Sequence, residues 1–147
     1  MRKTIIITGA NRGIGRASVK AFAERGYDVW ACARKPGETF ETDMAEESAR
    51  TGAAITPVYF DLLNEEEFRS GVKQILGEKR DVDVLLNCAG IPYGGLLTMT
   101  PLEKLREVYQ VNVFAQVQLM QLIARRMMRQ RGGCIINLCS AGGIEAH

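Results

Sequence analysis

The feature that most constrains the fold is a glycine-rich turn near the N-terminus. It covers residues 8–15, TGANRGIG, and lies between the apolar run Thr4–Thr8 and a stretch with helical periodicity. A pyrophosphate group must approach backbone N–H groups at the start of a helix, and side chains would keep it away. In such a turn Gly9 forms the tight bend, Gly13 permits the close approach and Gly15 packs the helix against the strand. The pattern predicts a dinucleotide-binding turn.

Short apolar runs alternate with longer stretches of helical periodicity along the chain, and 147 residues leave room for one core. This order predicts an α/β fold with a parallel sheet whose strands are too apolar on both faces to be half exposed. We expect one Rossmann-type NAD(P)-binding domain over residues 1–147, a doubly wound parallel sheet in three layers. The candidate strands are Thr4–Thr8, Asp28–Ala33, Ile55–Phe60, Val82–Asn87 and Cys134–Leu138.

Helix starts are indicated by a capping side chain followed three residues later by an acid. The pairs are Asp43 with Glu46, Asn64 with Glu67, and Thr100 with Glu103, the last followed by Pro101 at the first helical position. One long helix is expected over residues 101–130. Its last turn carries arginines before Gly132-Gly133, which is typical of a solvated helix end.

Composition excludes several classes of function. The formal net charge is +2, from 19 basic and 17 acidic residues, so electrostatics give no reason to expect nucleic acid or a membrane surface as a partner. No apolar stretch approaches the ~20 residues of a membrane span, and we expect a cytoplasmic location. Cysteines 32, 88, 134 and 139 lack C-x-x-C spacing, so we expect no metal site and reduced thiols in the core.

The cofactor is indicated by the end of the second candidate strand. An enzyme selective for NAD would place an acid there for the ribose hydroxyls, but Ala33 is followed by Arg34 and Lys35. A guanidinium grips a 2′-phosphate that a carboxylate would repel, and Arg12 projects from the glycine turn as well. We therefore expect NADP(H), with NAD(H) less favoured; the alternative is that Arg34 and Lys35 are solvated loop charges. A P-loop is excluded because Gly15 is followed by Arg-Ala rather than Lys-Ser or Lys-Thr.

Taken together, these motifs resemble those of the short-chain dehydrogenase/reductase family, and the N-terminal part of its 3-oxoacyl-(acyl-carrier-protein) reductases in particular. The turn matches the family's T-G-x-x-x-G-x-G, and residues 87–90, NCAG, look like its N-N-A-G with cysteine in place of the second asparagine. Asp61 matches the acid that family members place against adenine. Asn112 and Ser140 match the asparagine of the long helix and the serine after the fifth strand.

This resemblance implies a set of functional residues. Ser140 would hydrogen-bond the substrate carbonyl or hydroxyl, and Asn112 would help to hold a water-linked proton relay. The cofactor-binding residues would be Gly9, Asn11, Arg12, Gly13, Ile14, Gly15, Arg34, Asp61, Leu62, Asn87, Ala89 and Gly90.

The sequence departs from the family pattern near its end. The family's acid is a tyrosine with a lysine four residues later, and none of Tyr27, Tyr59, Tyr93 and Tyr109 has such a partner. A positioned proton donor contributes roughly 10²–10⁴-fold to a rate, so we expect this chain alone to be inactive. His147 as a substitute acid is less favoured than an incidental terminal residue. The fold would stop after the fifth strand and leave its edge exposed, as expected for a fragment of a longer enzyme.

Three hypotheses follow. The first is an NADP(H)-dependent oxidoreductase that reduces a ketone, such as a 3-oxoacyl group, or oxidises a secondary alcohol, and works as a homodimer or homotetramer. The second is a non-catalytic dinucleotide-binding or oligomerising module. The third is a non-functional truncation product, which would aggregate and bind no nucleotide. The sequence does not identify the small carbonyl or alcohol substrate.

Overall fold

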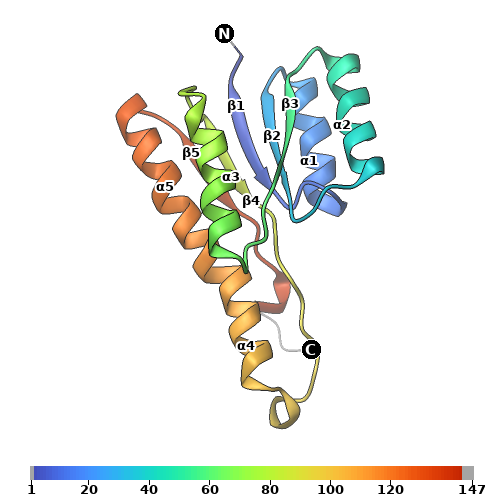
Figure 1. Cartoon of the computed structure of the whole chain (residues 1–147), viewed down its shortest axis with the longest axis vertical. Helices are drawn as coiled ribbons and strands as arrows, with labels where there is room; N and C mark the ends of the chain where they lie inside the picture. The colour runs from blue at the N-terminus through green and yellow to red at the C-terminus, as the bar shows by residue number, and fades with distance from the viewer. Residues whose placement is uncertain (1, 144–147) are drawn as a thin grey trace.

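A single parallel sheet organises the computed structural model of the chain, which describes residues 2–143. The strand order is β3-β2-β1-β4-β5, and every pair of neighbours is parallel (Figure 1). The predicted Rossmann-type α/β class is confirmed. The strands are β1 (Thr4–Thr8), β2 (Asp28–Ala33), β3 (Ile55–Tyr59), β4 (Val84–Asn87) and β5 (Cys134–Asn137).

Helices cover both faces of the sheet, which gives the three predicted layers. Ile5 and Ile7 of β1 pack into one core with α1 and α2, and Ile6 packs into the other with α3 and α5. All three isoleucines are fully buried, and burying such a side chain contributes roughly 1.5–3 kcal/mol. The helices are α1 (Gly13–Glu24), α2 (Glu38–Thr51), α3 (Glu65–Gly77), α4 (Leu102–Tyr109) and α5 (Ala115–Gln130), with short 3₁₀ turns η1 (Leu97–Met99) and η3 (Ala141–Gly143).

The strand order reverses at β1. The chain proceeds outward through β2 and β3, then returns to place β4 on the other side of β1. In open α/β sheets ligands bind outside the carboxyl ends of the strands at such a switch point. Figure 1 shows α4 and η1 extending past this end of the sheet.

Only one of the predicted helix caps is confirmed. The Asn64 side chain accepts hydrogen bonds from the backbone N–H groups of Glu66 and Glu67 at the start of α3. The Asp43 prediction is wrong because α2 already begins at Glu38, after an extended Gly37; Asp43 lies inside the helix.

The predicted Thr100 cap is also wrong. The Thr100 hydroxyl donates to the Leu96 carbonyl oxygen at 2.9 Å, so it closes the preceding turn instead of capping α4. The residue before α4 is Pro101, in an extended conformation. Pro101 therefore stands just outside the helix and accepts its first backbone hydrogen bonds.

The long helix is interrupted by a π-turn. The five residues Gln110–Phe114 (η2) form a π-helical segment between α4 and α5. Such turns contain one additional residue and are frequent at functional sites. Asn112, a predicted site residue, lies at the centre of this turn.

The expectation that every strand is buried on both faces is wrong for the two edge strands. Only Val58 of the five β3 residues is buried, and three of the four β5 residues are exposed, including Ile136 at 40%. The expectation of four core thiols fails for the same reason. All four cysteines are free, but only Cys32 is buried, while Cys134 and Cys139 are exposed on β5 and just after it.

Residues 2–143 contain neither a membrane-spanning helix nor a cluster of metal ligands. No helix in this range combines the length and the apolar character needed to span a bilayer. Within the same range, no three histidine, cysteine or acidic side chains gather closely enough to hold a metal ion. The remaining predicted residue, His147, lies outside the described residues.

Candidate functional site

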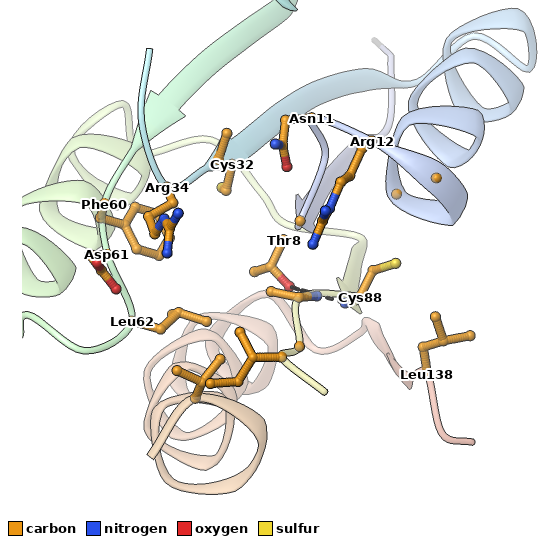
Figure 2. Close-up of a pocket in the computed structure, with 18 of the residues that line it drawn as sticks. Thr8, Asn11, Arg12, Cys32, Arg34, Phe60, Asp61, Leu62, Cys88 and Leu138 are labelled. Carbon is orange, nitrogen blue, oxygen red and sulfur yellow. Dashed lines mark hydrogen bonds between the residues drawn. The ribbon is translucent and has the colours of Figure 1, made fainter. Parts of the chain in front are cut away.

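A cavity of about 470 Å³ opens at the carboxyl ends of the strands around the switch point (Figure 2). Its walls come from the glycine turn after β1 and from the segments that follow β2, β3 and β4. Eleven of the fourteen predicted site residues line it. They are Gly9, Asn11, Arg12, Gly13, Ile14, Gly15, Arg34, Asp61, Leu62, Ala89 and Gly90.

The glycine turn is shaped by close backbone contacts. A Cβ on Gly15 would lie 2.1 Å from the Gly9 carbonyl oxygen, and a Cβ on Gly9 would lie 2.9 Å from the Ala89 Cα. Gly9 also has a φ of +66°, which favours glycine. Gly13 has a φ of +54°, and a Cβ there would meet no atom within 4 Å. Gly9 and Gly15 are thus required by packing, whereas Gly13 borders open space.

The start of α1 leaves backbone donors available. No side chain among residues 2–143 caps this helix, and its first turn carries no acid. The first intrahelical bond runs from the Arg16 N–H to the Arg12 carbonyl oxygen, so the N–H groups before Arg16 have no helical acceptor. At α3, by contrast, Asn64 occupies the equivalent donors. The positive end of α1 therefore faces the cavity ready for an anion.

Two arginines bring positive charge to the same cavity. Arg12 precedes α1, and Arg34 follows β2; Figure 2 shows both side chains around the opening. The last residue of β2 is the buried Ala33, so no carboxylate stands at the end of that strand. Lys35 is exposed and does not line the cavity. This arrangement places two guanidinium groups and no strand-end acid on the cavity, and a guanidinium can bind an anionic group through paired hydrogen bonds.

The segment after β3 contributes one carboxylate and several apolar side chains to the cavity wall. Asp61 Oδ1 accepts from the Leu63 N–H at 2.9 Å, and the Asp61 N–H donates to Glu67 Oε2 at 2.9 Å. Phe60, Leu62 and Leu63 line the cavity beside Asp61. Among residues 2–143, Asp61 Oδ2 has no hydrogen-bond partner, so it can accept from a ligand.

The segment after β4 is fixed by side chains of other elements. Thr8 Oγ1 accepts from the Cys88 and Ala89 N–H groups at 3.0 and 3.1 Å (Figure 2), and Gln116 Nε2 donates to the Ala89 carbonyl oxygen at 2.7 Å. Burial raises the pKa of the Cys88 thiol, which stands in place of an asparagine. The wall of the cavity is therefore held from β1 on one side and from α5 on the other.

Asn112 does not line the cavity, but it holds the adjoining loop. Its Oδ1 accepts from the Ile91 N–H at 2.8 Å, and its Nδ2 donates to the Ile91 carbonyl oxygen at 2.9 Å. A Cβ on Gly90 would lie 3.4 Å from Asn112 Oδ1. The π-turn thus presents an amide that binds both backbone groups of Ile91, which itself lines the cavity.

Asn87 and Ser140 also lie off the cavity. Asn87 is 1% exposed, and its Nδ2 donates at 2.8 Å to Asn137 Oδ1 on the neighbouring strand. Ser140 is exposed, and its Oγ accepts from the Gly142 N–H at 3.2 Å. Leu138, two residues before Ser140, reaches the cavity. Asn87 therefore joins β4 to β5, and Ser140 follows the lining residue Leu138 without lining the cavity itself.

Several cavity residues were not predicted from the sequence. Some of these residues lie at or just after strand ends, so their position in the sequence could have indicated them. Glu107 and Val111 come from α4 and the π-turn, and nothing in the sequence indicates that these elements approach the cavity. The unpredicted lining residues are Thr8, Cys32, Ala33, Phe60, Leu63, Cys88, Ile91, Glu107, Val111 and Leu138.

A doubly wound sheet with a glycine turn at its switch point defines a dinucleotide-binding α/β protein. The sequence matches the short chain dehydrogenase family over residues 3–147. The chain belongs to this family, whose members are oxidoreductases, and the predicted resemblance is confirmed.

Relatives and a solved structure agree with this assignment. The chain is 33% identical to carbonyl reductase family member 4 of Xenopus tropicalis, over 100% of this chain and 58% of that protein. It is 32% identical to a 3-oxoacyl-(acyl-carrier-protein) reductase of Staphylococcus epidermidis, over 97% of this chain and 58% of that protein. A short-chain dehydrogenase from Sphingobium yanoikuyae in complex with NADPH superposes with a TM-score of 0.87 at 27% identity, covering 97% of this chain and 55% of that one. The chain thus spans little more than half the length of these proteins.

Proposed function

We propose that this chain is the NADP(H)-binding part of an oxidoreductase that reduces a ketone or oxidises a secondary alcohol. The observation that carries the proposal is the placement of Arg12 and Arg34 on the cavity formed by the glycine turn, with Ala33 rather than an acid at the end of β2. The protein of known structure that was solved with NADPH supports the choice of cofactor.

The residues present fit such a cofactor. The open space at Gly13 and the uncapped N–H groups of α1 would receive the pyrophosphate, as expected for an anion at a helix N-terminus. Arg12 and Arg34 would bind the 2′-phosphate, and Asp61 with Leu62 would contact the adenine. Ala89 and Gly90 would form the wall along the dinucleotide. Asn87, at the end of β4, would fix the start of this segment through its hydrogen bond to Asn137. When bound, the nicotinamide supplies or accepts a hydride.

The substrate side rests on two further residues. Ser140 would hydrogen-bond the carbonyl or hydroxyl group, and Asn112 would keep the Gly90–Ile91 segment in place through its two bonds to Ile91. The reductase of Staphylococcus epidermidis supports a 3-oxoacyl-type substrate. Because no tyrosine among the 147 residues has a lysine four positions later, we expect the chain alone to bind cofactor without turnover.

A second candidate function is a dinucleotide-binding or oligomerising module without catalysis. The described lining of the cavity comes from residues 8–138, so nucleotide binding would not need the catalytic pair. Exposed Leu105, Tyr109 and Phe114 on α4 and the π-turn favour association into a homodimer or homotetramer. A cytoplasmic location remains our prediction from composition.

The test is calorimetric titration of the 147-residue protein with NADPH and NADH. We expect NADPH to bind more tightly, and Arg34→Ala to lower the NADPH affinity about 10- to 100-fold, as loss of a hydrogen bond to a charged group does, with little effect on NADH. Lys35→Ala is the matched control, since Lys35 carries the same charge next to Arg34 but lies off the cavity. Equal affinity for both nucleotides would contradict the NADP(H) assignment. If neither nucleotide binds, the only remaining hypothesis is that the chain is a non-functional truncation product.

A further inference from the structure

We propose that Glu107 is a specificity-determining residue that, together with Asp61, selects a purine carrying an exocyclic amine at the base end of the cavity. This inference rests on the proposed function, because it assumes that the cavity takes a dinucleotide. It assigns a role to a residue that no sequence motif contains.

Packing brings Glu107 to the same end of the cavity as Asp61. Gln110 Nε2 donates to the Leu62 carbonyl oxygen at 3.4 Å, so the start of the π-turn lies against the segment after β3. Glu107 lies one turn earlier on the same helix, and Val111 follows four residues after it, so both face the same side. Both line the cavity that Asp61 and Leu62 line.

The composition of this end of the cavity matches an adenine ring. Leu62, Leu63 and Val111 offer apolar surface for the ring faces, and two carboxylates offer only acceptors. The 6-amino group of adenine has two N–H donors, one for each carboxylate. A 6-oxo purine would present an acceptor at the same position, and a carboxylate facing it would leave both groups without a donor.

The carboxylate of Glu107 is available for this contact. Its Oε2 accepts from Lys104 Nζ at 2.8 Å, and no partner of Oε1 is found among residues 2–143. The side chain is 34% exposed, compared with 52% for Lys104. Lys104 thus binds one carboxylate oxygen and leaves the other without a partner among residues 2–143, on a residue that lines the cavity. An exposed ion pair of this kind contributes little to stability, so Glu107 can be replaced without unfolding the protein.

The experiment compares NADPH with its deamino analogue, in which hypoxanthine replaces adenine. We expect the wild-type protein to bind NADPH at least about tenfold more tightly than the analogue, as a lost hydrogen bond to a charged group predicts. Glu107→Gln should lower this ratio about fivefold or more, because the glutamine amide can donate to the 6-oxo group. Isothermal titration gives both dissociation constants for each variant.

Two control variants separate the direct contact from general effects. Glu103→Gln makes the same change of charge one turn earlier on α4, and Glu103 lies off this cavity. Lys104→Met removes the ion pair but keeps the Glu107 carboxylate. Both variants should keep the wild-type ratio.

The outcomes distinguish this inference from the proposed function. If Glu107→Gln binds NADPH with an unchanged ratio, the inference is overturned while NADP(H) binding stands. A Lys104→Met ratio as low as that of Glu107→Gln would also overturn it, because the ion pair alone would then explain the effect. If the wild-type protein binds neither nucleotide, both proposals fall.

Discussion

At the scale of single residues, the glycines of the turn serve different needs. Gly9 and Gly15 are fixed by contacts with neighbouring backbone, whereas Gly13 borders open space. The shared pattern T-G-x-x-x-G-x-G therefore combines a packing requirement with a ligand requirement. Substitutions at these positions should separate the two effects.

Gly15→Ala should damage both the fold and the site. Its methyl group would meet the Gly9 carbonyl oxygen at 2.1 Å and the Ala10 nitrogen at 3.2 Å, so the turn must shift. We expect a loss of about 1–3 kcal/mol in the free energy of unfolding, as in other overpacked sites, and at least a tenfold weaker NADPH affinity. Denaturant unfolding and calorimetry measure the two quantities.

The matched control is Gly77→Ala at the end of α3. A Cβ at Gly77 meets no atom within 4 Å, so alanine should be neutral there or stabilise the helix by up to about 1 kcal/mol. Equal effects of the two substitutions would show that the close contact at Gly15 does not matter.

At the scale of elements, sequence reasoning succeeded where a local rule decides the outcome. Asn64 caps α3 because Asn64 itself is extended after a short turn and no earlier helix start competes. The same rule failed at Asp43 because α2 had already begun five residues earlier, at Glu38. The apolar residues over 101–130 indicated the long helix, but no residue type in the sequence marks a π-turn, so the interruption at Gln110–Phe114 was not predicted.

The candidate site shows the same division. The glycines, Arg34 and Asp61 were predicted because motifs place them beside strand ends, and the structure brings them to one cavity. Glu107 was not predicted, because its position depends on the packing of the π-turn against the segment after β3, where Gln110 donates to the Leu62 carbonyl oxygen. The open edge of β5 was expected for a fold that stops after the fifth strand. The exposure of its side chains was not expected, because the sequence CIIN resembles that of a buried strand.

The π-turn should be needed to hold the cavity wall. Asn112→Ala would leave the Ile91 N–H and carbonyl oxygen without their side-chain partners. We expect a loss of about 1–3 kcal/mol in unfolding free energy, from two part-buried hydrogen bonds of about 0.5–1.5 kcal/mol each, together with weaker NADPH binding. Thermal unfolding with and without NADPH measures both effects.

Gln121→Ala is the corresponding control on the exposed side of α5. Alanine is a good helix former, so this substitution should change stability by no more than about 0.5 kcal/mol. If Asn112→Ala behaves like Gln121→Ala, the two bonds to Ile91 contribute nothing to the wall.

At the scale of the whole molecule, the four cysteine thiols differ in solvent accessibility, so their reactivity shows which surfaces are exposed. Cys134 and Cys139 are exposed, Cys88 is half-buried on the cavity, and Cys32 is buried. Burial raises the pKa of the Cys32 thiol to about 12, so little of its reactive thiolate exists near neutral pH.

We therefore expect two fast reactions with a thiol reagent at pH 8, at Cys134 and Cys139. Cys88 should react slowly and be protected by NADPH, and Cys32 should react only after denaturation. Peptide mapping by mass spectrometry identifies the modified positions. Slow reaction at Cys134 would mean that β5 is covered in solution, for example by another copy of the chain.

The π-turn also divides the longest helix into two halves with separate orientations. An α-helix turns by about 100° per residue, so the additional residue rotates α5 relative to α4 by about that angle. One half can direct Glu107 toward the cavity while the other directs Leu119 and Ile123 toward the sheet. In an uninterrupted helix with the same sequence, either Glu107 would face the cavity or Leu119 and Ile123 would face the sheet, but not both. A deletion of one residue within 110–114 would thus mislocate every later side chain of the helix at once, whereas substitutions on α4 leave the core unchanged.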